Sequence, residues 1–157
     1  MQDLPHQYHV SAIAGETGSV VLNSEGLPGL TTGPPPEFGG EPGHWSPETL
    51  LAGAVADCFV LSFRGIARAS RFTWTHLECQ VEAVLERPDG VTRFTTYKVM
   101  PTLTIPKSGS VEKAQKLLEK AEKYCLITNS LLGEKELICQ IKQDDSPNPD
   151  QGWDEAV

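Results

Sequence analysis

The spacing of hydrophobic residues changes along the chain and predicts a strand hairpin near its centre. Between residues 72 and 87, apolar and polar side chains alternate with a period of two, which is typical of a half-buried β-strand. The apolar face of this segment consists of Leu77, Cys79, Val81, Ala83 and Leu85. Pro88-Asp89-Gly90 then predicts a turn. Residues 91–105, rich in Thr, Val, Phe and Tyr, predict the second long strand.

A long helix is predicted before this hairpin. Ser46 is a hydroxyl N-cap, Pro47 occupies a position where its missing N–H is not needed, and Glu48 places an acid in the first turn. We expect the helix to run to about residue 69. Between residues 50 and 63 only Asp57 and Ser62 are clearly polar. Such a helix is apolar nearly all round, so we expect it to be buried on more than one side.

A second helix follows the hairpin and is amphipathic. Ser110 is its predicted N-cap, and its apolar positions are spaced by three, four, three and four residues with Glu and Lys between them. These positions are Val111, Ala114, Leu118, Ala121 and Cys125.

The ends of the chain predict further strands. Residues 6–14 and 19–23 predict a hairpin, and alternating Leu137, Cys139 and Ile141 predict a final strand. Eight of the eleven residues from 33 to 43 are Gly or Pro, so this segment is a loop, either a plain connector or a wall of a pocket. The order β-β-α-β-β-α-β predicts an α+β fold with helices packed on antiparallel sheet.

Composition narrows the class of protein. We expect one domain over residues 1–143 and an acidic, flexible tail over residues 144–157. The formal net charge is −8 and no basic cluster occurs, which argues against nucleic acid as a partner. The N-terminus lacks signal-peptide features and no uninterrupted apolar run approaches eighteen residues. We therefore expect a soluble, cytoplasmic protein without a membrane partner.

The four cysteines are the candidate chemistry. They contain no Cys-x-x-Cys pair, and the histidines are not spaced to complete a metal site, so we expect neither a metal nor another cofactor. Cys79 and Cys139 fall on apolar strand faces and are interpreted as core residues. Cys58 and Cys125 lie on the predicted helices. Pattern alone favours packing over catalysis for these two as well.

The sequence around Cys58 and Cys125 resembles the OsmC/Ohr family of peroxide-handling proteins, and the likeness covers most of the chain. Its strongest part is the segment Pro-Glu-Thr-Leu beginning at Pro47, followed by a run of small residues and by Cys58 ten residues beyond Glu48. The segment from Ala121 to Cys125, with Asn129 and Ser130 after it, resembles the helix that carries the family's second cysteine.

This resemblance implies an OsmC-like fold, an intertwined homodimer and a thiol-dependent peroxidase that reduces organic hydroperoxides. It implies that Cys58 attacks the peroxide and that Cys125 then forms a disulfide with it. A dithiol reductant, of lipoyl type in the better-known members, would reopen that disulfide. Glu48 is the third implied site residue. About 15 Å of helix separates it from Cys58, so the partner subunit would have to supply it. Helix-dipole compensation is its structural alternative.

The chain departs from the family in its charges. Members carry an arginine on the N-terminal hairpin, whereas this chain has neither arginine nor lysine before Arg64. His9, His44 or Arg93 are possible substitutes, and the sequence selects none of them. Asp57 points to another side of the helix from Cys58 and is given no role.

Two alternatives remain open at this point. The same thiol pair could act on another electrophile, since the family's arginine is missing. Alternatively, the chain could be a non-catalytic dimer whose apolar cleft binds a small lipophilic molecule, with Cys58 as part of its lining.

Overall fold

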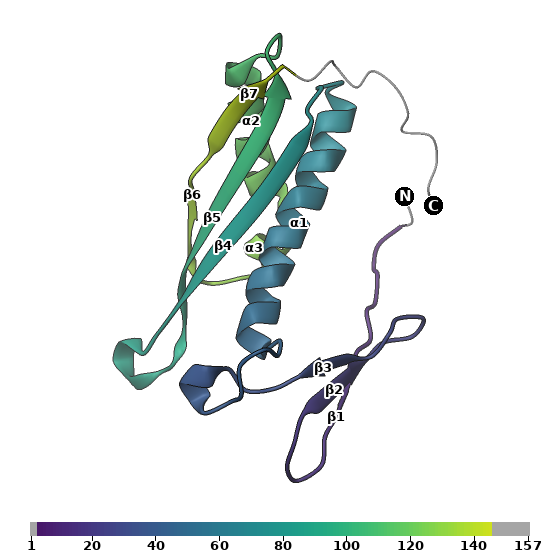
Figure 1. Ribbon diagram of the computed structural model, residues 1–157, viewed down its shortest axis with the longest axis vertical. Coiled ribbons are helices and arrows are strands. Elements are labelled where there is room, and N and C mark those ends of the chain that lie inside the picture. The colour runs from purple at the N-terminus through teal and green to yellow at the C-terminus, as the bar shows by residue number, and fades with distance from the viewer. Residues whose placement is uncertain (1–2, 146–157) are drawn as a thin grey trace. The chain divides into compact units, whose positions relative to one another are not determined.

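The computed structural model describes residues 3–145, which form an α+β protein (Figure 1). The chain divides into two compact units, residues 1–51 and 52–157. The expectation of one domain over residues 1–143 depends on how these units pack together and stays a prediction. The expected tail lies outside the described residues, except that Asp144 and Asp145 are described and Asp144 ends the last strand.

The first unit contains a small antiparallel sheet of β1 (Ser11–Ile13), β2 (Val20–Asn23) and β3 (Leu30–Thr32). The expected hairpin is confirmed, with a shorter first strand than predicted. The third strand was not predicted. Among the strand residues of this sheet only Thr32 is buried. The Gly/Pro-rich loop that follows contains one short 3-10 turn, η1 (Pro36–Phe38).

Helix α1 (Pro47–Ala69) begins where the sequence predicts. The Ser46 hydroxyl accepts from the backbone N–H of Thr49 at 3.2 Å, and the Thr49 hydroxyl accepts from the N–H of Ser46 at 2.8 Å. This reciprocal pair satisfies backbone donors at the helix start. The buried residues of α1 form one stripe, Val55, Phe59, Phe63 and Ala67. The chain by itself therefore buries α1 on one side, whereas burial on more than one side was expected.

The second unit contains a mixed sheet of β4 (His76–Glu86), β5 (Arg93–Pro106), β6 (Glu134–Leu137) and β7 (Gln140–Asp144). Strands β4 and β5 form the predicted antiparallel hairpin, which η2 (Pro88–Gly90) closes. Strands β6 and β7 pair with β5 in parallel, so an entirely antiparallel sheet was a wrong expectation (Figure 1). The reason is topological, because a helical crossover connects β5 to β6 and such a connection joins parallel strands.

Pro101 explains why the last strand is split into β6 and β7. The backbone N–H of Ile138 donates to the carbonyl oxygen of Val99 at 2.9 Å, so the hydrogen-bonding groups of Val99 face this strand. Pro101 is the next residue of β5 with the same orientation, and it has no N–H to donate. Pairing resumes at Gln140, opposite Thr102.

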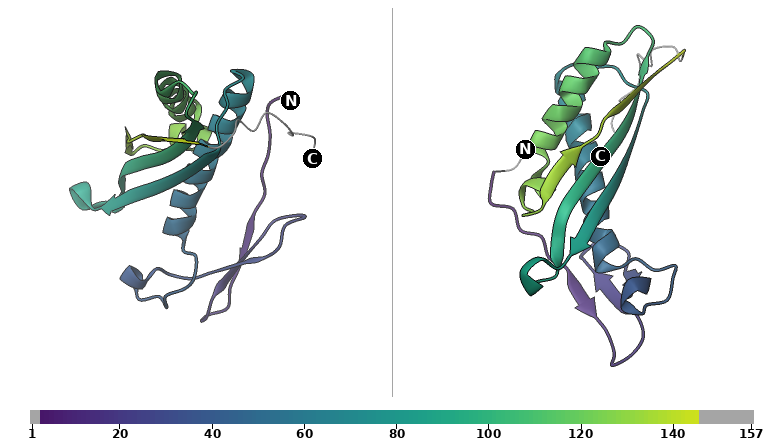
Figure 2. Two further views of the ribbon diagram at one scale, coloured as in Figure 1. Left: turned by 45° about the horizontal axis from the view of Figure 1, so that its top comes forward. Right: turned by 90° about the vertical axis from the view of Figure 1, so that its left-hand side faces the viewer.

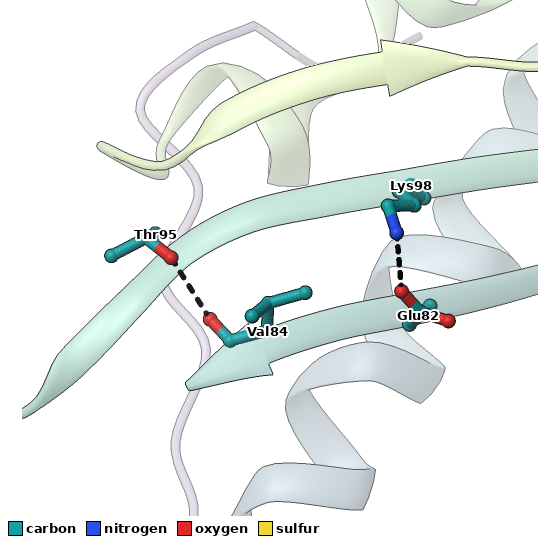
Figure 3. A network of polar contacts seen from close by, with 4 residues as sticks. All are labelled: Glu82, Val84, Thr95 and Lys98. Atoms are coloured by element: carbon teal, nitrogen blue, oxygen red, sulfur yellow. Dashed lines mark hydrogen bonds and ion pairs between the residues drawn. The ribbon is translucent and has the colours of Figure 1, made fainter. Parts of the chain in front are cut away.

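The β4–β5 hairpin contains a β-bulge between Val84 and Leu85. Before the bulge the register is regular, and Lys98 forms an ion pair of 2.6 Å with Glu82, which lies directly opposite (Figure 3). At the bulge the Thr95 hydroxyl donates to the carbonyl oxygen of Val84 at 3.4 Å (Figure 3). Thr95 of β5 is the unpaired residue of this bulge, because Val84 pairs with Thr96 and Leu85 pairs with Phe94. Leu85, expected on the buried face, is 37% exposed near the end of β4.

Helices α2 (Val111–Tyr124) and α3 (Leu126–Asn129) connect β5 to β6, and Figure 2 shows α2 running along the sheet. The Ser110 hydroxyl caps α2 by accepting from the N–H of Lys113 at 3.1 Å, as predicted. Val99, Leu103 and Ile105 are fully buried on one face of β5. With the buried stripe of α1 and the apolar side of α2 they form the hydrophobic core.

Candidate active site

Cys58 lies on α1, within the part of the helix that belongs to the second unit. Its neighbour Phe59 is fully buried, whereas Cys58 itself is half-buried. The helix thus holds Cys58 at the margin of the core, where the residue is not fully enclosed. A nucleophilic thiol needs such a position, because a fully enclosed sulfur could not reach a substrate.

Cys125 lies at the junction between α2 and α3 and is fully buried. Its backbone (φ −67°, ψ 106°) is extended, so α2 ends there and α3 begins at the next residue. Its N–H donates to the carbonyl oxygen of Glu122, and its own carbonyl oxygen accepts from the N–H of Asn129, both at 3.1 Å. These bonds on both sides fix the backbone from which the thiol projects.

The structure brings Cys58 and Cys125 together. The pKa of the Cys125 thiol is raised first by burial and, in addition, by a hydrogen bond and charge interaction with Cys58. Contacts with the hydroxyl and backbone N–H of Thr128 act in the opposite direction and lower this pKa. All four cysteines are free thiols in the structure. Cys125 is therefore a thiol that keeps its proton while it lies against Cys58.

Cys79 and Cys139 lie on either side of Pro101. Cys79 is directly opposite Pro101 in the β4–β5 pair, and Cys139 occupies the gap between β6 and β7 beside it. Two strand spacings, about 10 Å, separate their backbones. This exceeds the Cα separation of roughly 7 Å that a disulfide can span.

Both strand cysteines are poor nucleophiles. Burial, followed by the charges of Cys125 and Cys139, raises the pKa of Cys79 to about 12. Burial also raises the pKa of Cys139, and a hydrogen bond with Gln115, which lowers this pKa, is the smaller effect. Thiolates rather than thiols attack peroxides and disulfides. Both residues are half-buried rather than fully buried in the core, so their interpretation as core residues stays a prediction.

Glu48 stands in the first turn of α1 and belongs to the first unit. Its Oε2 atom is buried and has no hydrogen-bond partner among the residues that the structure describes. Buried carboxylate oxygens are normally paired, because removing them from water is unfavourable. Glu48 is therefore ready to accept a donor that residues 3–145 of a single chain do not provide.

The cation that would replace the family's arginine is not identified by the described residues. His9 and His44 lie in the first unit, outside its strands, and are exposed. Arg93 begins β5 opposite Glu86. Among residues 3–145 no group of three or more His, Cys, Asp and Glu side chains could hold a metal ion.

Sequence reasoning missed Thr128. This residue lies in α3, is 1% exposed, and donates its hydroxyl to the backbone carbonyl oxygen of Cys125 at 3.0 Å. A polar residue three positions after Cys125 gives no sign of burial by itself. The only available signal was the run Thr128, Asn129 and Ser130, whose side chains commonly bond to nearby backbone.

Residues 39–139, well over half of the chain, match the family described as OsmC-like protein. The chain therefore belongs to the OsmC-like protein family. It is similar to the uncharacterized protein YmaD of Bacillus subtilis (strain 168), with 29% identity over 108 residues that cover 66% of this chain and 71% of YmaD.

Two solved structures show the same fold. An OsmC-like protein from Mycoplasma pneumoniae has a TM-score of 0.77 and 17% identity, covering 89% of this chain and 100% of that one. An organic hydroperoxide resistance protein OsmC from Legionella pneumophila has a TM-score of 0.70 and 23% identity, covering 89% of this chain and 99% of that one. The predicted OsmC-like fold is thus confirmed.

Proposed function

We propose that this protein is a thiol-dependent peroxidase that reduces organic hydroperoxides. The observation that carries the proposal is the direct interaction between the Cys58 and Cys125 thiols. Membership of the OsmC-like family supports it, as does the similar fold of a protein named for organic hydroperoxide resistance. The unequal burial of the two sulfurs supports different roles for them.

In the first step the Cys58 thiolate attacks one oxygen of the hydroperoxide. The O–O bond breaks, the alcohol leaves after taking a proton, and Cys58 becomes a sulfenic acid. The sulfur of Cys125 then attacks the sulfur of Cys58 and forms a disulfide, and the sulfenic oxygen leaves as water. The peroxide gains two electrons and the pair of thiols loses two.

A dithiol reductant completes the cycle. One of its thiolates attacks the Cys58–Cys125 disulfide, and its second thiol then resolves the mixed disulfide and leaves as an oxidised dithiol. By family resemblance the reductant is of lipoyl type. Cys58 is the less buried residue of the pair, because Cys125 is fully buried. We propose Cys58 as the sulfur that the reductant reaches.

The active form is proposed to be a homodimer. Only 22% of the most apolar part of α1 is buried within the chain, and Leu61 on its open side is 53% exposed. By length and composition alone α1 could cross a membrane. We assign it instead to the core of a soluble, cytoplasmic dimer, because the matched family segment includes α1 and because Asp57, Arg64 and Arg68 lie on its open side.

Glu48 is proposed to act across the dimer interface. Its buried Oε2 lacks a partner among the described residues, and a donor from the second subunit would satisfy it. In the family this role belongs to an arginine that the present chain lacks before Arg64.

The same absence supports the second candidate function, a thiol enzyme that acts on an electrophile other than a peroxide.

The test is coupled consumption of hydroperoxide and dithiol. Purified protein with cumene hydroperoxide and dihydrolipoamide should consume both in equal amounts, and Cys58→Ser should abolish this consumption. Hydrogen peroxide should be a poorer substrate, because the residues around Cys58 on α1 are mostly apolar. A protein that remains fully reduced in excess organic hydroperoxide would rule out the peroxidase.

A further inference from the structure

Few groups of the described residues act on the Cys125 thiol. Cys58 and Thr128 shift its pKa, and Cys79 lies near enough for the charges of the two sulfurs to interact. Thr128 and Cys125 are 1% and 0% exposed, so water does not compete for the contact between them. Whatever charge develops on the Cys125 sulfur must therefore be stabilised by protein groups.

The Thr128 side chain is held three residues beyond Cys125 by α3. Its hydroxyl donates to the Cys125 carbonyl oxygen at 3.0 Å and also contacts the Cys125 thiol, whose pKa it lowers. The hydroxyl therefore has two acceptors within reach in the resting thiol, the carbonyl oxygen and the sulfur of Cys125.

The segment around Thr128 is fixed by its own bonds. The Asn129 side-chain amide donates to the carbonyl oxygen of Lys123 at 3.0 Å, and the Ser130 hydroxyl donates to that of Leu126 at 2.8 Å. The first bond ties α3 to the end of α2, and the second closes α3 itself. They hold Thr128 at a constant position relative to Cys125 through a change in the charge of the sulfur.

We propose that Thr128 is a positioning residue of the redox cycle, whose hydroxyl turns from the Cys125 carbonyl oxygen to the Cys125 sulfur whenever that sulfur carries negative charge. This inference rests on the proposed function for its role in the cycle. The sulfur is negative twice, first when Cys125 attacks the sulfenic acid and later when it leaves the disulfide. In the second event the reductant sulfur bonds to Cys58, the disulfide bond breaks, and Cys125 departs with the electron pair.

Thr128 should affect both events in the same direction. The contacts from Thr128 lower the pKa of the Cys125 thiol, against the larger effect of burial. A thiol of lower pKa gives more thiolate at neutral pH and is a better leaving group. Thr128 should have little effect on the first attack of Cys58 on peroxide, in which Cys125 remains protonated.

The experiment uses disulfides prepared without peroxide. Wild type, Thr128→Val, Thr128→Ala and Thr128→Ser are oxidised with diamide, the Cys58–Cys125 disulfide is confirmed by peptide mapping, and its reduction by dithiothreitol is followed at several pH values. Thr128→Val and Thr128→Ala should be reduced at least about tenfold more slowly, the effect of removing one hydrogen bond to a charged group. Thr128→Ser keeps the hydroxyl and should match wild type.

Thr75→Val is the matched control, because Thr75 also donates its hydroxyl to a backbone carbonyl, that of Thr104 at 3.2 Å, without touching a cysteine. It should match wild type. Valine has the shape of threonine and alanine is smaller, so one of the two variants serves if the other folds poorly. Equal rates in wild type, Thr128→Val and Thr128→Ala would overturn the proposal, as would a Thr128→Ser variant as slow as Thr128→Val.

A second arm separates this inference from the proposed function. With cumene hydroperoxide, Thr128→Val should form the Cys58 sulfenic acid at the wild-type rate, convert it to the disulfide more slowly, and reach the wild-type conversion rate only at higher pH. If peroxide fails to oxidise wild type while the diamide-made disulfides still differ in their reduction rates, the peroxidase is wrong and the role of Thr128 stands.

Discussion

The thiols of Cys58 and Cys125 interact directly, although one residue lies on α1 and the other at the end of α2. The pair is asymmetric. Cys125 is fully buried and holds its proton, whereas Cys58 is half-buried at the margin of the core. A structural disulfide or two packed core cysteines would need no such difference. A nucleophile and a resolving thiol do need it, because only the first must meet a substrate.

One equivalent of cumene hydroperoxide should therefore produce a single disulfide, Cys58–Cys125. Cys79 and Cys139 should stay reduced, because burial keeps both protonated and their backbones are too far apart to be bridged. Peptide mass mapping after alkylation of the free thiols measures this outcome. A disulfide that includes Cys79 or Cys139 would contradict the assignment.

The two site cysteines should give opposite results when replaced. In Cys125→Ser the sulfenic acid of Cys58 has no resolving thiol, so Cys58 should progress to the sulfinic and sulfonic acids and the protein should be inactivated by repeated turnover. Cys58→Ser should not react with the peroxide at all. Intact-mass spectra after increasing peroxide doses distinguish these results. Equal behaviour of the two variants would mean that the roles are not divided as proposed.

Cys79→Ser should leave peroxidase activity nearly intact and lower the free energy of unfolding by about 1–2 kcal/mol at pH 7.5, since it puts a hydroxyl on an apolar strand face. Loss of activity with unchanged stability would show that Cys79 belongs to the site. Urea denaturation and the coupled assay measure the two quantities on the same samples.

The same variant tests the titration of Cys79. Its pKa is about 12 in the folded protein against an ordinary value of 9.0, so the unfolded chain loses this proton first. The stability gained by keeping Cys79 protonated is fully present below pH 9 and is lost as the pH rises through about 12. The stability advantage of wild type over Cys79→Ser should accordingly shrink above pH 9. A constant difference would contradict the titration.

Much of the fold could be predicted from periodicity and caps. Alternation gave β4 and β5, and Ser46 and Ser110 marked both helix starts, because these signals depend only on residues close in sequence. The bulge at Leu85 and the gap at Ile138 could not be predicted in this way. The gap between β6 and β7 arises from Pro101 on β5, so it can be recognised only when the pairing between these strands is known. The helical crossover after β5 does indicate the parallel direction of β6 and β7, since such a connection joins parallel strands.

The candidate site could be predicted only in part, and less completely than the fold. The resemblance to a family pointed to Cys58 and Cys125, which periodicity alone would have assigned to the core. Thr128 acts through a contact with the residue three positions before it and has no signature beyond its hydroxyl. The group that satisfies Glu48 is absent from residues 3–145 of one chain, so no reading of local pattern could identify it.

Glu48→Gln should separate a role in the site from helix-dipole compensation. Glutamine keeps the shape and removes the charge, so the proposed pairing across the interface is weakened. We expect peroxide reduction in a single turnover to slow by at least about tenfold. Stopped-flow measurement of Cys58 oxidation gives this rate.

Glu112→Gln is the matched control for Glu48→Gln, because Glu112 is the first-turn acid of α2. A first-turn acid contributes about 0.3–1 kcal/mol to stability through the dipole. Glu112→Gln should therefore lose a little stability and no activity. If Glu48→Gln behaves in the same way, Glu48 only compensates the dipole of α1.

The protein should be an obligate homodimer. The sheet β1–β3 buries no apolar side chain among its strand residues, and Ile13 is 62% exposed. Three strands without a core of their own are not expected to be stable in water. The open side of α1, with Leu61 53% exposed, also requires cover.

Sedimentation should show a dimer at micromolar concentration, and Leu61→Arg should shift it toward a monomer of lower stability. Val91→Arg is the control, since Val91 is 58% exposed in the turn between β4 and β5 and a charge there should change neither mass nor stability. A well-folded wild-type monomer would refute the dimer, and with it the proposal that Glu48 finds its partner in a second subunit.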